Sequence, residues 1–143
     1  MRQVTVLSTI MVFTKSPTPK IRKWQDLKSL TIGLRLGAKF AEYNTKGMKV
    51  ISAATNQMVF RMLDRNRVDV VVNTALEGTI MIRKLGLKGI SLVHPPLVTL
   101  NLFHYLHKDH EGLLRRITAV LKAMKRERRI HVIRDTAFKQ LSN

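Results

Sequence analysis

The sequence predicts an α/β fold built around a mainly parallel sheet. Short segments rich in β-branched residues alternate with segments of helical periodicity through the middle of the chain, a pattern typical of strands joined by crossover helices. The segment Val68–Val72 contains four valines in five residues, as expected of a strand buried on both faces of such a sheet. With 143 residues, 45% of them hydrophobic, the chain can form one ordinary domain or two small lobes.

The first predicted element is a strand over Val4–Phe13. Polar residues interrupt this apolar stretch, and no small-residue cleavage site follows before Lys15, so we expect a strand and not a signal peptide. Pro17 and Pro19 end the strand, because proline cannot donate a hydrogen bond to a β-ladder. A short helical turn is then predicted over Ile21–Leu27.

The next strand is predicted over Thr31–Leu36 and ends at Gly37, where a turn leads into a short helix over Ala38–Tyr43. Met48–Ser52 is a further strand candidate. Thr55 follows it and is a good N-cap, since a threonine hydroxyl can accept a bond from a free N–H of the first helical turn.

The helix after Thr55 is predicted from apolar residues at helical spacing, namely Met58, Val59, Met62 and Leu63. Asn66 closes this helix, and the valine-rich strand follows. A second helix is expected over Ala75–Leu85, with Gly86 as its C-terminal cap.

The last third of the chain begins with a predicted strand over Ile90–Val93, which Pro95–Pro96 should stop. Leu97–Leu106 is expected to be extended. Asp109 is then predicted to cap a helix, and a final helix is predicted over Ile130–Leu141. The apolar stripe of the first of these helices consists of Leu113, Leu114, Ile117, Val120, Leu121 and Met124.

The composition narrows the classes of function. No apolar run approaches the roughly 18 to 20 residues that a membrane-spanning helix needs. The chain has no cysteine, which excludes disulfides, thiolate metal sites and cysteine nucleophiles. We find no nucleophile elbow, phosphate-binding loop or paired carboxylates, so we expect no enzyme activity and no cofactor.

The charge favours anionic partners, because 26 lysines and arginines stand against 9 acidic residues and give a net charge of +17. The basic run Lys122–Arg129 ends a predicted helix, where cations complement the helix dipole. The alternative is a phosphate-contacting patch. No aromatic residue is interleaved for base stacking, so nucleic-acid binding is the less favoured of the two interpretations.

Three histidines also suggest a metal site, since His104, His107 and His110 are spaced three apart. On an extended segment, residues three apart point to opposite faces of the sheet, so His104 and His107 cannot converge there. No nearby cysteine or glutamate completes an ordinary ligand set. We therefore expect no metal.

Three passages resemble the amino-acid-binding family of bacterial extracellular solute-binding proteins. Trp24–Gly37 reads WQDLKSLTIGLRLG, similar to the family's W-x-D-L-K-G-x-x-I-G-V-x-x-G. Met62–Val72 reads MLDRNRVDVVV, similar to its M-L-x-x-G-R-V-D-A-V-V. Tyr105–Leu114 reads YLHKDHEGLL, similar to its Y-x-x-x-x-K-x-H-x-x-L. In order and spacing, the resemblance covers nearly the whole chain.

This resemblance implies a type II periplasmic-binding-protein-like fold, in which two α/β lobes joined by hinge strands close over a small ligand. Residues 20–96 would form the second lobe, and residues 1–19 with 97–143 would form the hinge strands and a partial first lobe. The resemblance also implies that the family's opening section, which forms most of the first lobe, is absent from this sequence. The resemblance also implies a small polar ligand, a membrane transporter (of the ABC type) or a sensor as partner, and a periplasmic location, with a cytoplasmic one if Met1 is the natural start.

The first candidate ligand-binding site is the turn at Gly37, Ala38 and Lys39, together with Arg35. A glycine turn that leads into a helix presents free N–H groups and the positive end of the helix dipole. In the family this turn touches the ligand's carboxylate, and it is usually followed by serine or threonine. Here Ala38 and Lys39 follow, so a hydroxyl is lost and a cation is gained. The alternative is that Arg35 and Lys39 are ordinary solvated charges.

The second candidate site is Asn73–Thr74. The family commonly places an aspartate at the position of Thr74, five residues after Asp69, where it pairs with the ligand's amino group. Without this carboxylate the wall of the site would offer cations and neutral groups, so we expect a ligand that is anionic or neutral. The alternative is that Thr74 only caps the following helix. Asp69 itself is expected to be structural.

Two further expectations concern assembly and a rival function. A partial lobe should expose apolar surface on the hinge strands and on the helix Leu113–Met124, so we expect a homodimer or an exchange of elements that covers Leu97–Leu106. The rival function is that of a basic interaction protein that binds nucleic acid or an anionic surface.

Overall fold

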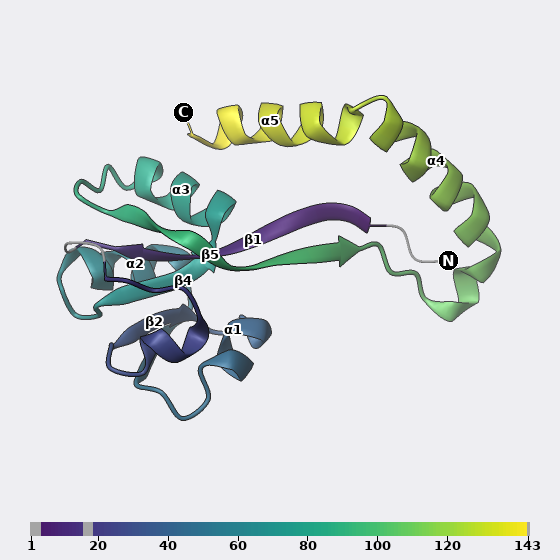
Figure 1. The fold of residues 1–143 in the computed structure, drawn as a ribbon. Coiled ribbons are helices and arrows are strands. Elements are labelled where there is room, and N and C mark those ends of the chain that lie inside the picture. Colours follow the sequence, from purple (N-terminus) through teal and green to yellow (C-terminus); the bar gives the residue numbers. More distant parts are fainter. Residues whose placement is uncertain (1–3, 16–18, 143) are drawn as a thin grey trace. The chain divides into compact units, whose positions relative to one another are not determined.

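The structure is a computed structural model that describes residues 4–15 and 19–142 (Figure 1). Contacts divide the chain into two compact units, of which unit 1 comprises Met1–Ser8 and Leu100–Asn143, and unit 2 comprises Thr9–Thr99. The elements are β1 Val4–Thr14, η1 Trp24–Leu27, β2 Ile32–Arg35, α1 Lys39–Asn44, β3 Val50–Ala53, α2 Asn56–Asp64, β4 Val70–Thr74, α3 Ala75–Lys84, β5 Ser91–Phe103, η2 Lys108–Leu113, α4 Leu114–Arg126 and α5 Arg129–Ser142.

The five strands form one sheet in the order β3-β2-β4-β1-β5. The strands β2 and β3 pair in parallel, with Ile32 opposite Val50, and β2 and β4 also pair in parallel, with Ile32 opposite Val70. By contrast, β1 pairs antiparallel with β4, with Val12 opposite Val72. The sheet is therefore mixed. Its parallel part consists of β2, β3 and β4, the strands that alternate with helices in the sequence and that were predicted to be parallel.

The hydrophobic core of unit 2 lies between the sheet and its helices. The helix α2 packs against β2, β3 and β4, and α3 packs against β4 and α2 (Figure 1). Phe13 of β1 and Phe60 of α2 are fully buried and meet edge to face, with ring centroids 5.2 Å apart. Val70 and Val71 are fully buried and Val72 nearly so, as predicted for this strand.

Most predicted elements are present, with ends shifted by a few residues, but two predictions about their ends are wrong. Pro95–Pro96 does not stop a strand, because β5 continues through it from Ser91 to Phe103. The strand β5 lies at the edge of the sheet, where a proline without an N–H donor is tolerated. Asp109 is not an N-cap, since η2 begins after His107, whose side chain accepts a bond from the N–H of Asp109.

In unit 1, α4 packs against η2 and α5. Over residues 7–8 and 100–140, where side-chain exposure is described, unit 1 has no buried side chain. The apolar stripe predicted on α4 is largely open to solvent, with Leu113, Leu114 and Val120 among its exposed residues. Among the described residues, no helix has the length and apolar character required to cross a bilayer. That these units correspond to the predicted lobes, with boundaries at residues 19 and 97, stays a prediction.

Candidate functional site

The predicted site residues lie at the carboxyl ends of the parallel strands β2 and β4, and Asn56, which was not predicted, lies after the neighbouring strand β3. The turn at Gly37 follows β2, Asn56 begins α2 shortly after β3, and Asn73–Thr74 ends β4. Because β2, β3 and β4 are parallel, their carboxyl ends meet at one edge of the sheet. In open α/β sheets this edge is the usual place for a ligand.

Backbone geometry and a carboxylate shape the turn after β2. Gly37 has a φ of +83°, a left-handed conformation that glycine adopts without strain. Its N–H donates to Glu42 Oε1 at 2.8 Å, while the N–H of Ala38 donates to the carbonyl of Arg35 at 3.1 Å. Lys39 Nζ lies 2.8 Å from Glu42 Oε2. An acidic side chain of α1 therefore already occupies part of the donor set that was predicted to meet a ligand carboxylate.

Glu42 was not among the predicted site residues, although it is charged and lies three residues after Lys39. The bond from the Lys39 ammonium and then the bond from the Gly37 N–H lower the pKa of the Glu42 carboxyl below its ordinary value. Lys39 is thus paired with Glu42, but its side chain is 84% exposed, so both the binding role and the alternative of a solvated cation stay predictions. Arg35 is exposed, and it forms no ion pair with any carboxylate in the described part of the chain.

A hydrogen-bonded cluster joins the end of β4 to the first turns of α2 and α3. Asn73 Nδ2 donates to Asn56 Oδ1 at 3.0 Å, and Asn73 Oδ1 accepts from the N–H of Thr74 at 2.7 Å. Thr74 Oγ1 accepts from the N–H of Glu77 at 3.1 Å, and Thr74 is the N-cap of α3, as the alternative interpretation predicted. Asn56 Nδ2 donates to Glu77 Oε2 at 3.4 Å. We call Asn56, Asn73, Thr74 and Glu77 the polar cluster.

The polar cluster corrects the expectation that this wall lacks an anion. Glu77 lies in the first turn of α3, where the helix dipole favours a negative charge, and its carboxylate reaches Asn56 across the edge of the sheet. It is exposed and forms no ion pair among the described residues. The sequence does contain a signal for it, since a threonine followed three residues later by glutamate is typical of the start of a helix.

Asp69 has the structural role predicted for it. Its carboxylate accepts a bond of 2.6 Å from the N–H of Thr31, just before β2. This bond ties the start of β4 to the start of β2, at the opposite edge from the polar cluster. The described residues contain no group of three side chains able to hold a metal ion, so His104, His107 and His110 do not form one.

No protein-family model matches this chain, and no curated protein matches it. Several solved structures do. A mutant of ArgBP from T. maritima matches with a TM-score of 0.76 and 18% identity over 96% of this chain and 60% of that chain. The GluR0 ligand-binding core in complex with L-glutamate matches with a TM-score of 0.79 and 14% identity over 94% of this chain and 61% of that chain.

A histidine kinase sensor domain with similarity to periplasmic binding proteins is also similar, with a TM-score of 0.76 and 18% identity over 92% of this chain and 59% of that chain. At identities this low, the structural likeness shows the fold alone. The chain has a type II periplasmic-binding-protein-like α/β fold, as predicted. It spans about three fifths of the length of the solved structures it matches.

Proposed function

We propose that this chain is a non-catalytic solute-binding module whose unit 2 contacts a small polar ligand at the carboxyl edge of β2, β3 and β4. The observation that carries this proposal is the polar cluster. Four hydrogen-bonded side chains and the starts of two helices gather at the edge of a parallel sheet. Solved structures of this fold include an ancestral arginine-binding protein bound to arginine and the GluR0 core in complex with L-glutamate.

The charges at this edge suit a ligand that carries both a carboxylate and an amine. Arg35 at the end of β2 can grip a carboxylate with two parallel bonds. Glu77 can receive an ammonium group in a charge-assisted bond. Lys39 adds a second cation close to the turn, although it is paired with Glu42. Because Lys39 is paired with Glu42, one cation (Arg35) and one carboxylate (Glu77) remain available, and this balance favours a ligand of neutral net charge over a cationic one.

The partner of such a module would be a membrane transporter or a sensor, with the module in the periplasm. Delivery to a transporter is what the family resemblance implies, and the match to a histidine kinase sensor domain supports signalling. In either case the module would hand on or report a ligand without changing it chemically.

The test is a titration of the isotope-labelled chain with glutamine, glutamate, succinate, lysine and arginine, followed by amide chemical shifts in NMR. We expect glutamine or glutamate to shift the amides of Asn56, Asn73 and Thr74 in a saturable way. Glu77→Gln should weaken binding of the amine-containing ligands by about tenfold or more, because it removes a charge-assisted hydrogen bond. It should leave succinate binding unchanged.

The matched control is Lys46→Ala, which removes an exposed cation from the loop after α1. It should not alter the titration. Tight binding of lysine or arginine that Lys39→Ala leaves unchanged would contradict the proposed charge preference. The absence of any saturable shift at the polar cluster, with every ligand tried, would contradict the proposed function itself.

A further inference from the structure

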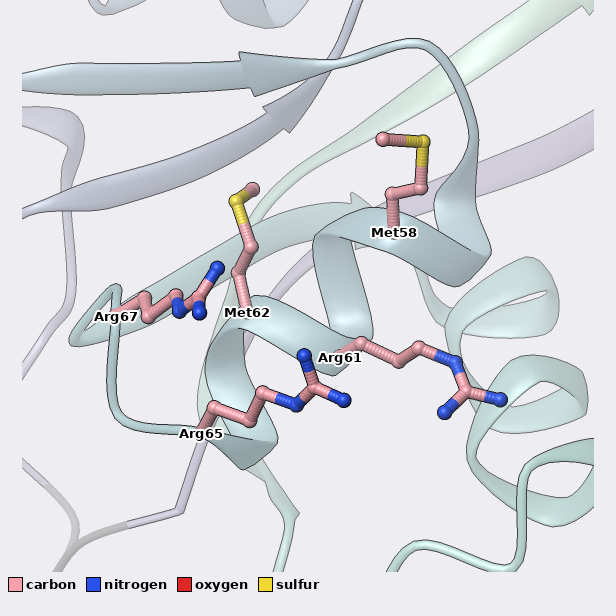
Figure 2. Close-up of a pocket in the computed structure, with 5 residues that line it drawn as sticks. All are labelled: Met58, Arg61, Met62, Arg65 and Arg67. Carbon is pink, nitrogen blue, oxygen red and sulfur yellow. The ribbon is translucent and has the colours of Figure 1, made fainter.

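A pocket that contains no residue of the polar cluster lies on α2 and the loop that follows it. Val59, Phe60 and Leu63 turn the inner face of this helix into the core. On the other side, a solvent-open pocket of about 210 Å³ is lined by Met58, Arg61, Met62, Arg65 and Arg67 (Figure 2). We call these five residues the arginine–methionine pocket.

The three arginines of this pocket lack acidic partners. None of their guanidinium groups is paired with a carboxylate of the described residues. Asp64, the acidic residue between them in sequence, is paired with Lys15, whose Nζ lies 2.9 Å from its Oδ1. Arg61 and Arg65 are four residues apart, so on a helix they are neighbours that repel each other. The helix dipole favours a cation in the last turn of α2, but it does not account for three cations around one hollow.

The two methionines give the pocket an apolar component. Met58 and Met62 are also four residues apart, and Met58 is 52% exposed. Figure 2 shows both side chains projecting from α2, with Arg61 on the same helix, Arg65 at its carboxyl end and Arg67 in the loop that follows. Flexible, polarizable thioethers adapt to the shape of an inserted apolar group, and methionine is frequent on surfaces that bind varied partners.

We propose that the arginine–methionine pocket is a docking site for an acidic segment of a partner protein, in which carboxylates flank a large apolar side chain. Each guanidinium can hold a carboxylate with two parallel bonds, while the methionines receive the apolar side chain. The net charge of +17 would steer such a segment toward this protein. No lining residue is aromatic, so the pocket offers no ring on which a nucleic-acid base could stack.

The test uses fluorescence anisotropy of a labelled peptide that has a central leucine between two pairs of glutamates, titrated with the full chain. The variant Arg61→Glu/Arg65→Glu should weaken peptide binding by about tenfold or more, since charge-assisted hydrogen bonds are lost and repulsion replaces them. The control variant Lys46→Glu/Lys88→Glu reverses two exposed lysines after α1 and α3 and changes the net charge equally. It should change binding by less than about twofold, because neither lysine lines the pocket and exposed charges beyond contact distance are screened by salt.

Two further comparisons separate the parts of the proposal. Replacing the central leucine of the peptide by serine should weaken binding to the wild type, and it should have a smaller effect with Met58→Ser/Met62→Ser, if the methionines receive that side chain. Circular dichroism and thermal melts establish that each variant folds.

Three results would overturn the proposal. One is an equal loss of peptide binding in the control variant, which would mean that only net charge matters. Another is an unchanged affinity after the leucine of the peptide is replaced. The third is a larger effect of Arg61→Glu/Arg65→Glu on a single-stranded oligonucleotide, or on vesicles of phosphatidylglycerol, than on the peptide.

Discussion

Gly78 of α3 packs against the ring of Phe13 of β1. This contact helps to fix the position of the start of α3, where Thr74 and Glu77 lie. Gly78 is buried. A Cβ atom built on it would overlap Cζ of Phe13 and lie 2.5 Å from Cε2 and 2.8 Å from Cε1 of the same ring. Alanine at this position therefore requires the ring or the helix to move.

The size of the effect follows from two opposing contributions. Alanine is favoured over glycine inside a helix by about 1 kcal/mol. Overpacking a core costs about 1–3 kcal/mol, and the upper end applies here because the Phe13 ring is fully buried and packs edge to face on Phe60. We expect Gly78→Ala to lower the free energy of unfolding by about 2 kcal/mol, and to lower Tm by roughly 5 to 10 °C.

The assay is urea unfolding followed by circular dichroism, with Gly112→Ala as the matched control. A Cβ at Gly112 would have no neighbour within 4 Å, so this variant should be neutral or slightly stabilised. Phe13→Leu in the Gly78→Ala background should cost less than Phe13→Leu alone, since the smaller side chain relieves the overlap. A Gly78→Ala variant at least as stable as the wild type would refute the packing argument.

Other predictions concern the helix cap, the glycine turn and the association of the chain. Thr74→Ala should lower the free energy of unfolding by about 1 kcal/mol, and Thr74→Ser by less, in the same urea assay, because serine keeps the capping oxygen. In the folded protein the pKa of Glu42 lies below its ordinary value of 4.5. The bonds of Glu42 to Lys39 and Gly37 should therefore contribute fully to the free energy of unfolding above about that pH, and this contribution should be lost as the pH falls through the pKa of the folded state. A carboxyl NMR titration measures this pKa, and Lys39→Ala should raise it. We expect a homodimer, or an exchange of elements, that covers the exposed residues Leu102, Tyr105 and Val120 of unit 1, and a monomer in light scattering at micromolar concentration would contradict this.

The fold could be predicted from sequence because its signals are local and repeat along the chain. Valine-rich segments gave the strand β4, and the spacing of Val59 and Leu63 gave the buried face of α2. The prolines before Leu97 misled the prediction of β5, because whether a proline ends a strand depends on its place in the sheet. The residues of β5 do not indicate that this strand lies at the edge of the sheet, where proline is tolerated.

The candidate site was predicted only in part, since its chemistry depends on contacts between segments. The sequence placed Asn73, Thr74 and the Gly37 turn near strand ends, and the structure brings these strand ends to one edge. The sequence did not indicate that the Glu42 carboxylate would accept a bond from the N–H of Gly37. Nor did it indicate that Glu77 would reach Asn56, 21 residues away. Such bonds form when packing brings the elements together, and the hydrophobic pattern does not encode them.

The helix α2 shows how one short element can serve the core, the candidate ligand edge and the arginine–methionine pocket at once. Its apolar inner face fixes its rotation on the sheet, because turning Phe60 and Leu63 away from the core would expose two fully buried or nearly buried side chains. With that rotation fixed, Asn56 faces the end of β4. The same rotation leaves Arg61 and Arg65 exposed on the outer side. The polar residues of α2 therefore acquire their positions from the apolar ones, and the proposed docking site can be tested at Arg61 and Arg65 without replacing a residue of the core.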